Sequence, residues 1–436
     1  MQVKVDILEG LQRKITVEIA SEKVEEKVLQ GLKKAQKTAK LDGFRKGKVP
    51  MKVIQQRYGA AVRQDVLGEL IESSYGDAIK QEKLIPAGQP HVHPVSGFAA
   101  NEPFVYEATL EIVPEFDVKG LDSLTIKKPV SEVGSKDVEA MLDTLRKQAA
   151  TWKNSEETAV EGDRVMINFV GKIDGKTFEG GSAEDVPVVL GAKQMLPEFE
   201  AALFDKKVGD NVVATVNFPE DYHGEDVAGK TAEFNIEVKL VEKPELPEVD
   251  AEFVKRFGIT EGGRKALEKA IRENMERELE SGIRRQINQQ VMQHLVDANQ
   301  VMLPNGMIAQ EKERLAHEQN LEKSVPDEEA RKKLIDEQLT EPARRRVLLG
   351  LIMGKLLEEK QIRPDAKRVE AHIERVAGTY EDPQEVREYY QKNPNALEQI
   401  YAQVMEDQLI DQLLENAKVV EEKCSFNDVM QGNIGG

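Results

Sequence analysis

The chain has 436 residues, more than one hydrophobic core of ordinary size requires, and this length predicts about three domains. Its net charge of −18 argues against general nucleic-acid binding by the whole chain, and its 40% apolar residues include no run near the ~18 that span a membrane. The start, MQVKVDILEG, lacks the apolar core of a signal peptide, and the single Cys424 excludes an intramolecular disulfide, so we expect a cytoplasmic protein.

Residues 1–60 are basic in an otherwise acidic chain. They hold 14 Lys and Arg against 7 Asp and Glu. A basic end on an acidic body suits one anionic docking partner. A solvated helix face rich in lysine is the simpler explanation, so charge alone does not establish a partner.

Alternating apolar residues predict strands at 2–8 and 11–20, and two helices follow them. Ser21 is the predicted N-cap of the first helix, because an acidic first turn comes directly after it. Pro50 is well placed to open the second helix. A proline-rich stretch at 85–98 and a further strand at 104–116 complete this part of the chain.

The loop between the two helices, GFRKGKVP at residues 43–50, sets one aromatic residue among cations. Arg45 can fork onto a carboxylate or phosphate, and Phe44 can fill a shallow apolar notch. Gly43 and Gly47 let the backbone approach a partner closely. A tip whose Phe44 folds back onto its own helices is the alternative, and the residues alone leave both open.

Residues 115–150 are predicted to be a connection followed by one amphipathic helix. Strand patterns come next, with a hairpin turn at Asp174-Gly175 and one short helix at 196–204. We therefore expect a compact antiparallel sheet wrapped on one helix over 151–243, which is an α+β module.

Everything after a linker at 242–250 is predicted to be helical. Apolar residues recur every four positions from Leu267 to Leu295, so the stripe winds around its helix and needs several partners in succession, or stays partly free. Prolines then divide the remainder into short helices, and 425–436 is predicted to fray. This part also holds 7 of the 12 methionines, whose flexible side chains suit adaptable surfaces but also fill cores.

These motifs resemble the trigger factor family, the bacterial ribosome-associated chaperones. GFRKGKVP is similar to the ribosome-docking signature of that family, and it stands in the same place, between two helices near the N-terminus. VMINFVGKIDGKTFEGG (165–181), LGAKQMLPEFEAAL (190–203) and FPEDYHGEDVAGKTAEFNIEV (218–238) resemble an FKBP-type prolyl isomerase domain. The likeness covers essentially the whole chain.

The resemblance implies that the loop contacts the ribosome beside the polypeptide exit tunnel, chiefly through a ribosomal protein. Contact with rRNA phosphates stays open, as does a homodimer away from the ribosome. Nascent and unfolded polypeptides are the implied clients, and no membrane partner is expected. The implied ribosome-binding residues are Gly43, Phe44, Arg45, Lys46, Gly47, Lys48 and Pro50.

The resemblance also implies an isomerase site. Glu179 stands where relatives often have aspartate, and Phe199 where many have tryptophan. Alternating aromatics in a small sheet are usually core, and Phe199 and Tyr222 fit that explanation least because neither continues a strand. Turning an X–Pro bond needs no acid, base or metal, so no cofactor or metal is expected. The implied site residues are Phe169, Phe178, Glu179, Met195, Leu196, Phe199, Tyr222, His223 and Phe234.

We therefore predict a multidomain α+β protein. It would comprise an α/β docking domain (1–114) with a helix-loop-helix tip, a connecting segment (115–150) that belongs with the C-terminal part, an FKBP-like domain (151–243) and an all-α chaperone domain (244–436). The predicted function is ATP-independent holding of nascent chains with prolyl isomerisation. The alternative is a soluble FKBP-type isomerase that acts on finished proteins without docking on the ribosome.

Overall fold

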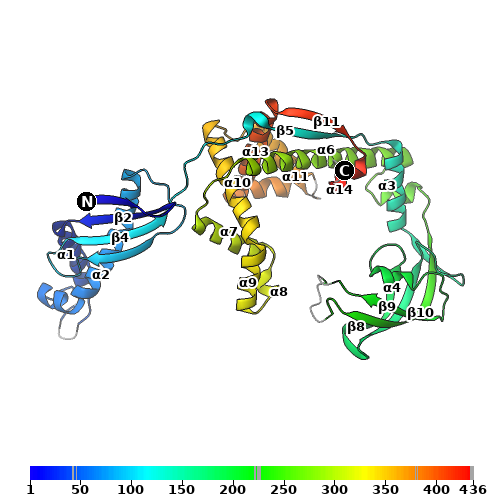
Figure 1. Ribbon diagram of the computed structural model, residues 1–436, viewed down its shortest axis with the longest axis horizontal. Helices are drawn as coiled ribbons and strands as arrows, with labels where there is room; N and C mark the ends of the chain where they lie inside the picture. The colour runs from blue at the N-terminus through cyan, green and yellow to red at the C-terminus, as the bar shows by residue number, and fades with distance from the viewer. Residues whose placement is uncertain are drawn as a thin grey trace. The chain divides into compact units, whose positions relative to one another are not determined.

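The computed structural model describes residues 1–41, 44–45, 47–219, 222, 227–378, 380 and 382–432. The chain divides into two compact units, of which unit 1 is Met1–Lys128 with Gln286–Val420 and unit 2 is Pro129–Arg285 with Glu421–Gly436. Each unit contains an antiparallel sheet, and the C-terminal half is largely helical, so the predicted α+β class is confirmed (Figure 1). Among the described residues, no helix is long and apolar enough to cross a membrane.

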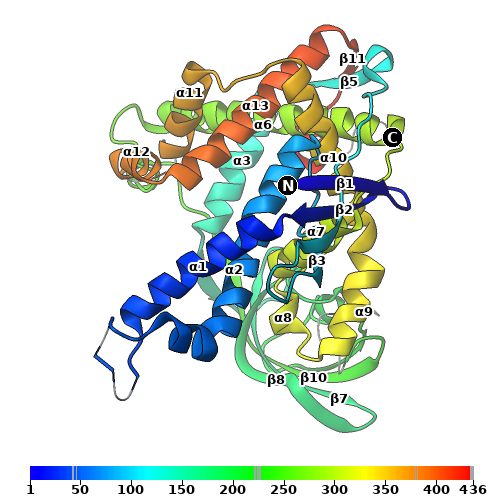
Figure 2. The same cartoon turned by 90° about the vertical axis from the view of Figure 1, so that its left-hand side faces the viewer.

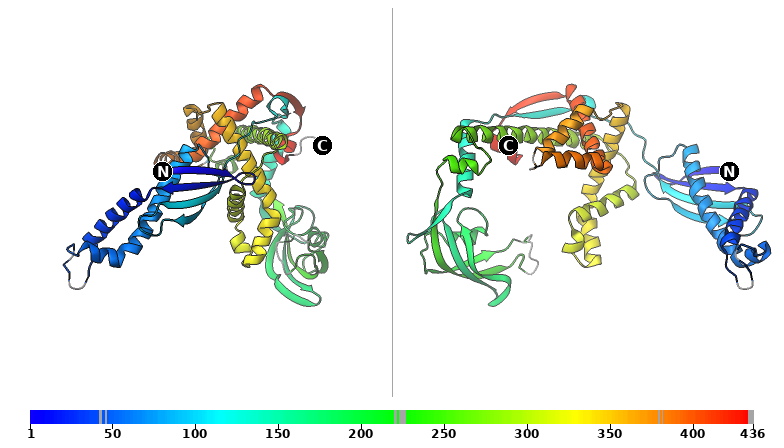
Figure 3. Two further views of the ribbon diagram at one scale, coloured as in Figure 1. Left: turned by 60° about the vertical axis from the view of Figure 1, so that its left-hand side comes forward. Right: turned by 180° about the vertical axis from the view of Figure 1, so that it is seen from behind.

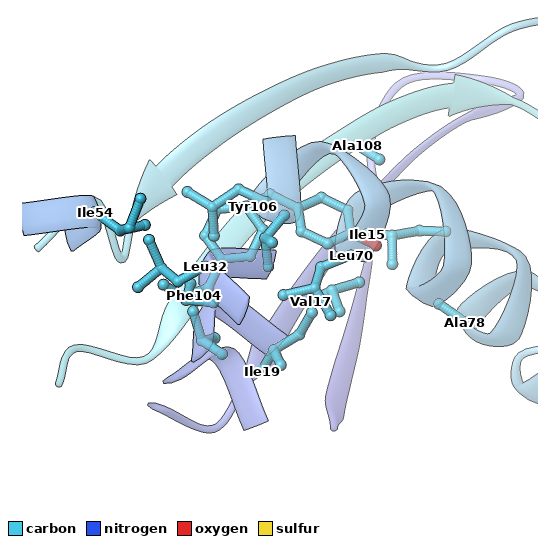
Figure 4. Packing of buried hydrophobic residues seen from close by; sticks show 14 of the residues in the cluster. Ile15, Val17, Ile19, Leu32, Ile54, Leu70, Ala78, Phe104, Tyr106 and Ala108 are labelled. Carbon is cyan, nitrogen blue, oxygen red and sulfur yellow. The ribbon is translucent and has the colours of Figure 1, made fainter. Parts of the chain in front are cut away.

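Unit 1 begins with a four-stranded antiparallel sheet that packs against two helices. Its strand order is β1-β2-β4-β3, with β1 Gln2–Ile7, β2 Gln12–Ile19, β3 His91–Ser96 and β4 Phe104–Glu111. Alternate residues of β4 enter the core, where Phe104 and Tyr106 are fully buried (Figure 4). The hydroxyl groups of Tyr106 and Ser74 share a hydrogen bond of 2.8 Å there, so the one polar atom of the buried ring has a partner.

The two helices form the predicted hairpin. α1 spans Ser21–Thr38 and α2 spans Met51–Gln81, and they run side by side (Figure 2). The N-cap prediction is wrong, because α1 begins at Ser21 with Ala20 as its N-cap and no side chain caps it. Pro50 is the N-cap of α2, directly before its first turn, as its fixed φ favours.

Unit 2 contains a five-stranded antiparallel sheet that encloses the short helix α4 (Pro197–Ala201). The strand order is β6-β10-β7-β8, with β9 also paired to β10. The strands are β6 Thr151–Ser155, β7 Arg164–Ile173, β8 Lys176–Val189, β9 Asn211–Asn217 and β10 Thr231–Glu245. The turn between β7 and β8 is the predicted Asp174-Gly175, with φ angles of 49° and 79° that an Asp-Gly turn favours.

Helix α6 (Gly263–Ala298) contributes to both units, and different partners bury its winding stripe along its length. In unit 2 the stretch from Leu267 to Leu279 packs against α3 (Ser135–Gln148), α5 (Ala251–Lys255) and α14 (Phe426–Gln431). In unit 1, Val291 and Leu295 are fully buried. The predicted succession of partners is confirmed. No stripe residue is left exposed, and Ile283 alone among the eight stays half-buried.

The segment predicted to fray forms α14 instead. Phe426 and Val429 are buried in unit 2, and Ser425 caps the helix by accepting the N–H of Asp428 at 3.2 Å. Gly282 of α6 lies close beneath it, since a Cβ there would approach Val429 to 3.2 Å. The prediction failed because tertiary packing, which no local pattern reveals, orders this segment. Residues 433–436 lie outside the described part.

The described residues of unit 1 include seven further helices, and prolines lie at the starts of several of them as predicted, although none precedes α8. Pro383 and Pro394 are the first residues of α12 and α13, and Pro304 is the N-cap of α7. The helices are α7 Asn305–Glu318, α8 Leu321–Ser324, α9 Glu328–Gln338, α10 Thr340–Glu359, α11 Ala366–Ala377, α12 Pro383–Lys392 and α13 Pro394–Glu415.

The segment before α3 contains the 3-10 turn η1 (Leu121–Ser123) and β5 (Thr125–Val130), which pairs with β11 (Lys418–Lys423) beside α6 (Figure 3). The part predicted to be all-helical therefore contains the strand β11, which a distant strand partner stabilises. Two amide side chains fasten it. Asn299 accepts the N–H of Lys119 at 2.8 Å and donates to the carbonyl oxygen of Lys119 at 3.0 Å. Gln290 repeats the arrangement with Lys127, at 2.9 and 2.8 Å. Each amide thus satisfies both backbone groups of one residue, as a neighbouring strand would.

The side-chain amides of Asn299 and Gln290 differ in burial, and this difference can be tested. Asn299 is 3% exposed and its bonds to Lys119 are partly buried, so Asn299→Ala leaves backbone groups that water reaches poorly without partners and lowers the free energy of local opening by about 1–3 kcal/mol. Gln290→Ala is the matched control, because water reaches its exposed bonds and replaces the amide. Hydrogen exchange of peptides covering 117–121 and 125–129 measures both effects. Equal losses of protection in the two variants would contradict this account.

Candidate functional site

The hairpin tip presents an aromatic ring and cations to solvent. Phe44 leaves 43% of its surface exposed, and Arg45 and Lys48 are exposed as well. This exposure favours a docking loop over a tip folded back onto its own helices. Gly43 and Lys46, which also belong to the predicted docking set, lie outside the described residues.

Backbone bonds and one buried residue anchor the tip. The N–H of Lys48 donates to the carbonyl oxygen of Arg45 at 2.9 Å. Gly47, between them in sequence, has φ at 78°, a left-handed conformation that glycine adopts without strain. Val49 is fully buried, and its carbonyl oxygen accepts from Nε2 of Gln36 at 2.6 Å. The exposed cations are therefore carried by an anchored turn.

Aromatic rings from different elements meet inside the sheet of unit 2, and we call them the aromatic cluster. Phe234 is central, with its ring centroid 5.3 Å from that of Phe199 and 5.8 Å from that of Phe169. Farther along, Phe218 packs against Tyr222 at 4.7 Å. These edge-to-face contacts suit the charge distribution of aromatic rings. The cluster consists of Phe169 (β7), Phe178 (β8), Phe199 (α4), Phe218 and Tyr222 (after β9) and Phe234 (β10).

The cluster has a buried floor and a half-buried rim. The floor is formed by Phe199, Phe218 and Phe234, whose exposed fractions are 4%, 8% and 6%. The rim is formed by half-buried side chains, namely Phe169, Phe178, Tyr222, Met195 and Leu196. A rim of this kind leaves an apolar surface within reach of a ligand, which a closed core does not.

Glycines in the strands make room for two rings of the cluster. A Cβ on Gly171 of β7 would lie 2.5 Å from Cε1 of Phe234. A Cβ on Gly181 of β8 would lie 2.8 Å from the ring of Phe178. Any larger residue at either position would displace a ring, because Cβ atoms do not approach other atoms so closely.

Two residues of this region, Phe218 and Glu200, are not among those predicted from the sequence. Phe218 continues the alternation of β9, and this pattern is typical of a core residue. The signal that could have assigned Phe218 to the site is its position four residues before the predicted site residue Tyr222. Glu200 is an acidic residue on a short helix, yet it is only 7% exposed. Of the predicted polar residues, Glu179 is exposed and His223 lies outside the described part.

The described residues contain no group of three or more His, Cys, Asp and Glu side chains that is placed to hold a metal ion. Among them, the cluster is walled by apolar and aromatic groups, with Glu179 exposed beyond it. The arrangement can therefore bind an apolar group and strip it of water.

Comparison with known proteins gives matches along the whole chain. The family model described as bacterial trigger factor protein matches residues 1–145, and the model of the trigger factor C-terminus matches residues 265–415. The model of FKBP-type peptidyl-prolyl cis-trans isomerase matches residues 155–239, the region of the aromatic cluster.

A curated protein and a solved structure agree with these models. The protein named Trigger factor from Dichelobacter nodosus (strain VCS1703A) is 44% identical over 434 residues, which cover 99% of each chain. A structure from work on promiscuous substrate recognition by the trigger factor chaperone covers 95% of this chain and 99% of its own, with a TM-score of 0.52. At 19% identity, that structural likeness concerns the fold alone.

Proposed function

This chain belongs to the trigger factor family, and from that premise we propose which of its residues carry each activity. It is a ribosome-associated chaperone with peptidyl-prolyl cis-trans isomerase activity, and it binds nascent chains. The alternative of an isomerase that acts only on finished proteins is not supported. Because ribosomes work in the cytoplasm, we propose that this protein works there.

We propose that the aromatic cluster is the isomerase site. A substrate proline would lie on the floor made by Phe199, Phe218 and Phe234, with the rim closing around it. The observation that carries the proposal is this half-buried rim over a buried aromatic floor, within the region that matches the isomerase family. The proposed site comprises Phe169, Phe178, Glu179, Met195, Leu196, Phe199, Phe218, Tyr222 and Phe234, with His223 assigned from the sequence alone.

The proposed mechanism is removal of water from the reacting amide. Isomerisation only twists that amide, against a barrier of ~20 kcal/mol. The twisted amide has lost resonance and carries less charge on its carbonyl oxygen, so water stabilises it less than the planar ground state. An apolar surface therefore favours the twisted form, and this is the differential binding that catalysis requires. This mechanism requires no proton transfer by Glu179.

Turnover of a proline-containing peptide by the full-length chain tests this mechanism. Phe199→Ala and Tyr222→Ala each remove part of the water-excluding surface, so each should lower kcat/KM at least about tenfold. Glu179→Gln is the matched polar control, and it should change kcat/KM by less than about threefold because no ionised group does chemistry. A steep pH–rate profile that follows a carboxylate would contradict desolvation as the mechanism.

We propose that the hairpin tip docks on the ribosome beside the exit tunnel. Phe44 would enter an apolar notch on a ribosomal protein, while Arg45 and Lys48 would pair with carboxylates or with rRNA phosphates. The exposure of all three residues on an anchored turn supports this role. Gly43, Lys46, Gly47 and Pro50 complete the proposed set, the first two from the sequence alone.

Co-sedimentation with ribosomes tests the docking proposal. The double variant Phe44→Ala/Arg45→Ala should abolish binding without changing the far-UV circular dichroism spectrum, and wild-type binding should weaken as salt rises. Phe98→Ala/Lys83→Ala is the matched control, since it also removes one exposed aromatic ring and one exposed cation from the N-terminal part. Unchanged binding by the tip variant, or equal loss in the control, would sink the docking assignment.

We propose that client chains are held chiefly by the helical part, residues 246–423. A hollow of ≈ 380 Å³ supports this, since Val369, Ile373 and Tyr401 of α11 and α13 line one part of it, while charged and polar side chains such as Glu374 and Arg387 line the rest. Only some of the methionines can contact a client, because Met353 is buried whereas Met302 is 63% exposed. Apolar burial is non-directional, so such surfaces retain many sequences.

We also propose the division into residues 1–114, 115–150, 151–243 and 244–436 as functional parts. The assignment of 115–150 to the C-terminal part is supported by the bonds of Lys119 and Lys127 to Asn299 and Gln290. It is also supported by the packing of Leu142 of α3 in one cluster with Leu267 of α6. We further propose that the chain forms a homodimer away from the ribosome.

A further inference from the structure

Glu200 carries a carboxylate into the interior of the isomerase domain. It lies on α4 directly after Phe199, and only 7% of its surface is exposed. A buried carboxylate is costly unless hydrogen bonds or a cation compensate its charge. Among the described residues, no Lys, Arg or His forms an ion pair with Glu200, so hydrogen bonds must stabilise it.

The compensating donors are backbone N–H groups of one loop. Oε2 of Glu200 accepts from the N–H of Gly191 at 3.2 Å. Oε1 accepts from the N–H of Gln194 at 3.1 Å and from that of Met195 at 3.4 Å. Both oxygens are therefore used, and the carboxylate gathers the loop of residues 191–196 around itself.

This loop needs such an internal tie because its own side chains bury little. Residues 191–194 are exposed, and the backbone turns sharply at Gly191, where φ is 84°. The loop ends in Met195 and Leu196, which belong to the rim of the aromatic cluster. The position of two rim residues thus depends on backbone that Glu200 holds from below.

We propose that Glu200 is a positioning residue of the isomerase, which fixes the loop 191–196 so that Met195 and Leu196 close the rim over the substrate proline. This inference rests on the proposed assignment of the aromatic cluster as the site. The role requires both oxygens to accept. Glutamine at this position would turn an NH₂ group toward at least one N–H donor and lose that bond.

The arrangement bears on catalysis because the rim excludes water. If the loop moves away, water reaches the amide and the preference for the twisted form weakens, although the floor remains. A misplacement of about 1 Å at such a site is enough to lower a rate by up to about a hundredfold. The effect should fall on kcat more than on KM, because the floor still binds the proline.

The test compares Glu200→Gln with Glu198→Gln in the full-length chain. Glu198 lies on the same helix but is exposed, so the two variants make the same chemical change at different burial. For Glu200→Gln we expect faster hydrogen exchange confined to peptides covering 191–196, and kcat lower by about tenfold or more on a proline peptide. Glu198→Gln should change neither quantity. Glu200→Asp keeps the charge at shorter reach and should fall between Glu200→Gln and the wild type.

Phe199→Ala separates failure of this inference from failure of the site assignment. If Phe199→Ala also leaves turnover unchanged, the aromatic cluster is not the site. If Phe199→Ala loses turnover while Glu200→Gln keeps it, the positioning role is wrong. It is equally wrong if exchange rises throughout 151–245 instead of in the loop, since Glu200 would then merely stabilise the domain. Should Glu200→Gln fail to fold, the same comparison is made with Glu200→Asp.

Discussion

The winding apolar stripe of α6 is the constraint on which the helical part depends. Its eight apolar residues are spaced by four positions, and four residues turn a helix slightly more than once. The stripe therefore winds around the helix, and one straight neighbouring helix cannot cover all of it. The chain meets this demand with partners from distant segments. α3, α5 and α14 cover the first part of the stripe in unit 2, and unit 1 buries Val291 and Leu295. The connecting segment is fastened beside the same helix by Asn299 and Gln290.

The isomerase domain answers a different physical demand. A reaction that only twists an amide gains most from a dry surface of the right shape, so its proposed site is made of rings instead of ionised groups. Gly171 and Gly181 let the rings of Phe234 and Phe178 lie close against the strands. The buried charge of Glu200 then serves the geometry of a loop, which is consistent with a site where position matters more than acidity.

Local patterns predicted the parts whose conformation is decided locally. The alternation of β4, the turn at Asp174-Gly175 and the prolines before the C-terminal helices all appear as expected. The failures involve contacts between distant residues. α14 is ordered by packing in unit 2. Glu200 is buried by the tertiary fold, and the sequence around it does not predict that burial. Phe218 was not predicted for another reason, because core residues and site residues give the same alternating pattern along a strand.

The central claim is that holding clients and turning prolines reside in separate parts of the chain. Thr151 and Glu245 are partners across neighbouring strands, so residues 151–245 can be removed and 150 joined to 246 over a short distance. Light scattering from a refolding client tests the claim most directly. The account predicts that this shortened chain, with no isomerase turnover, suppresses aggregation as well as the full chain at equal concentration. Loss of most of that protection in a shortened chain that keeps its helical circular dichroism signal would contradict it.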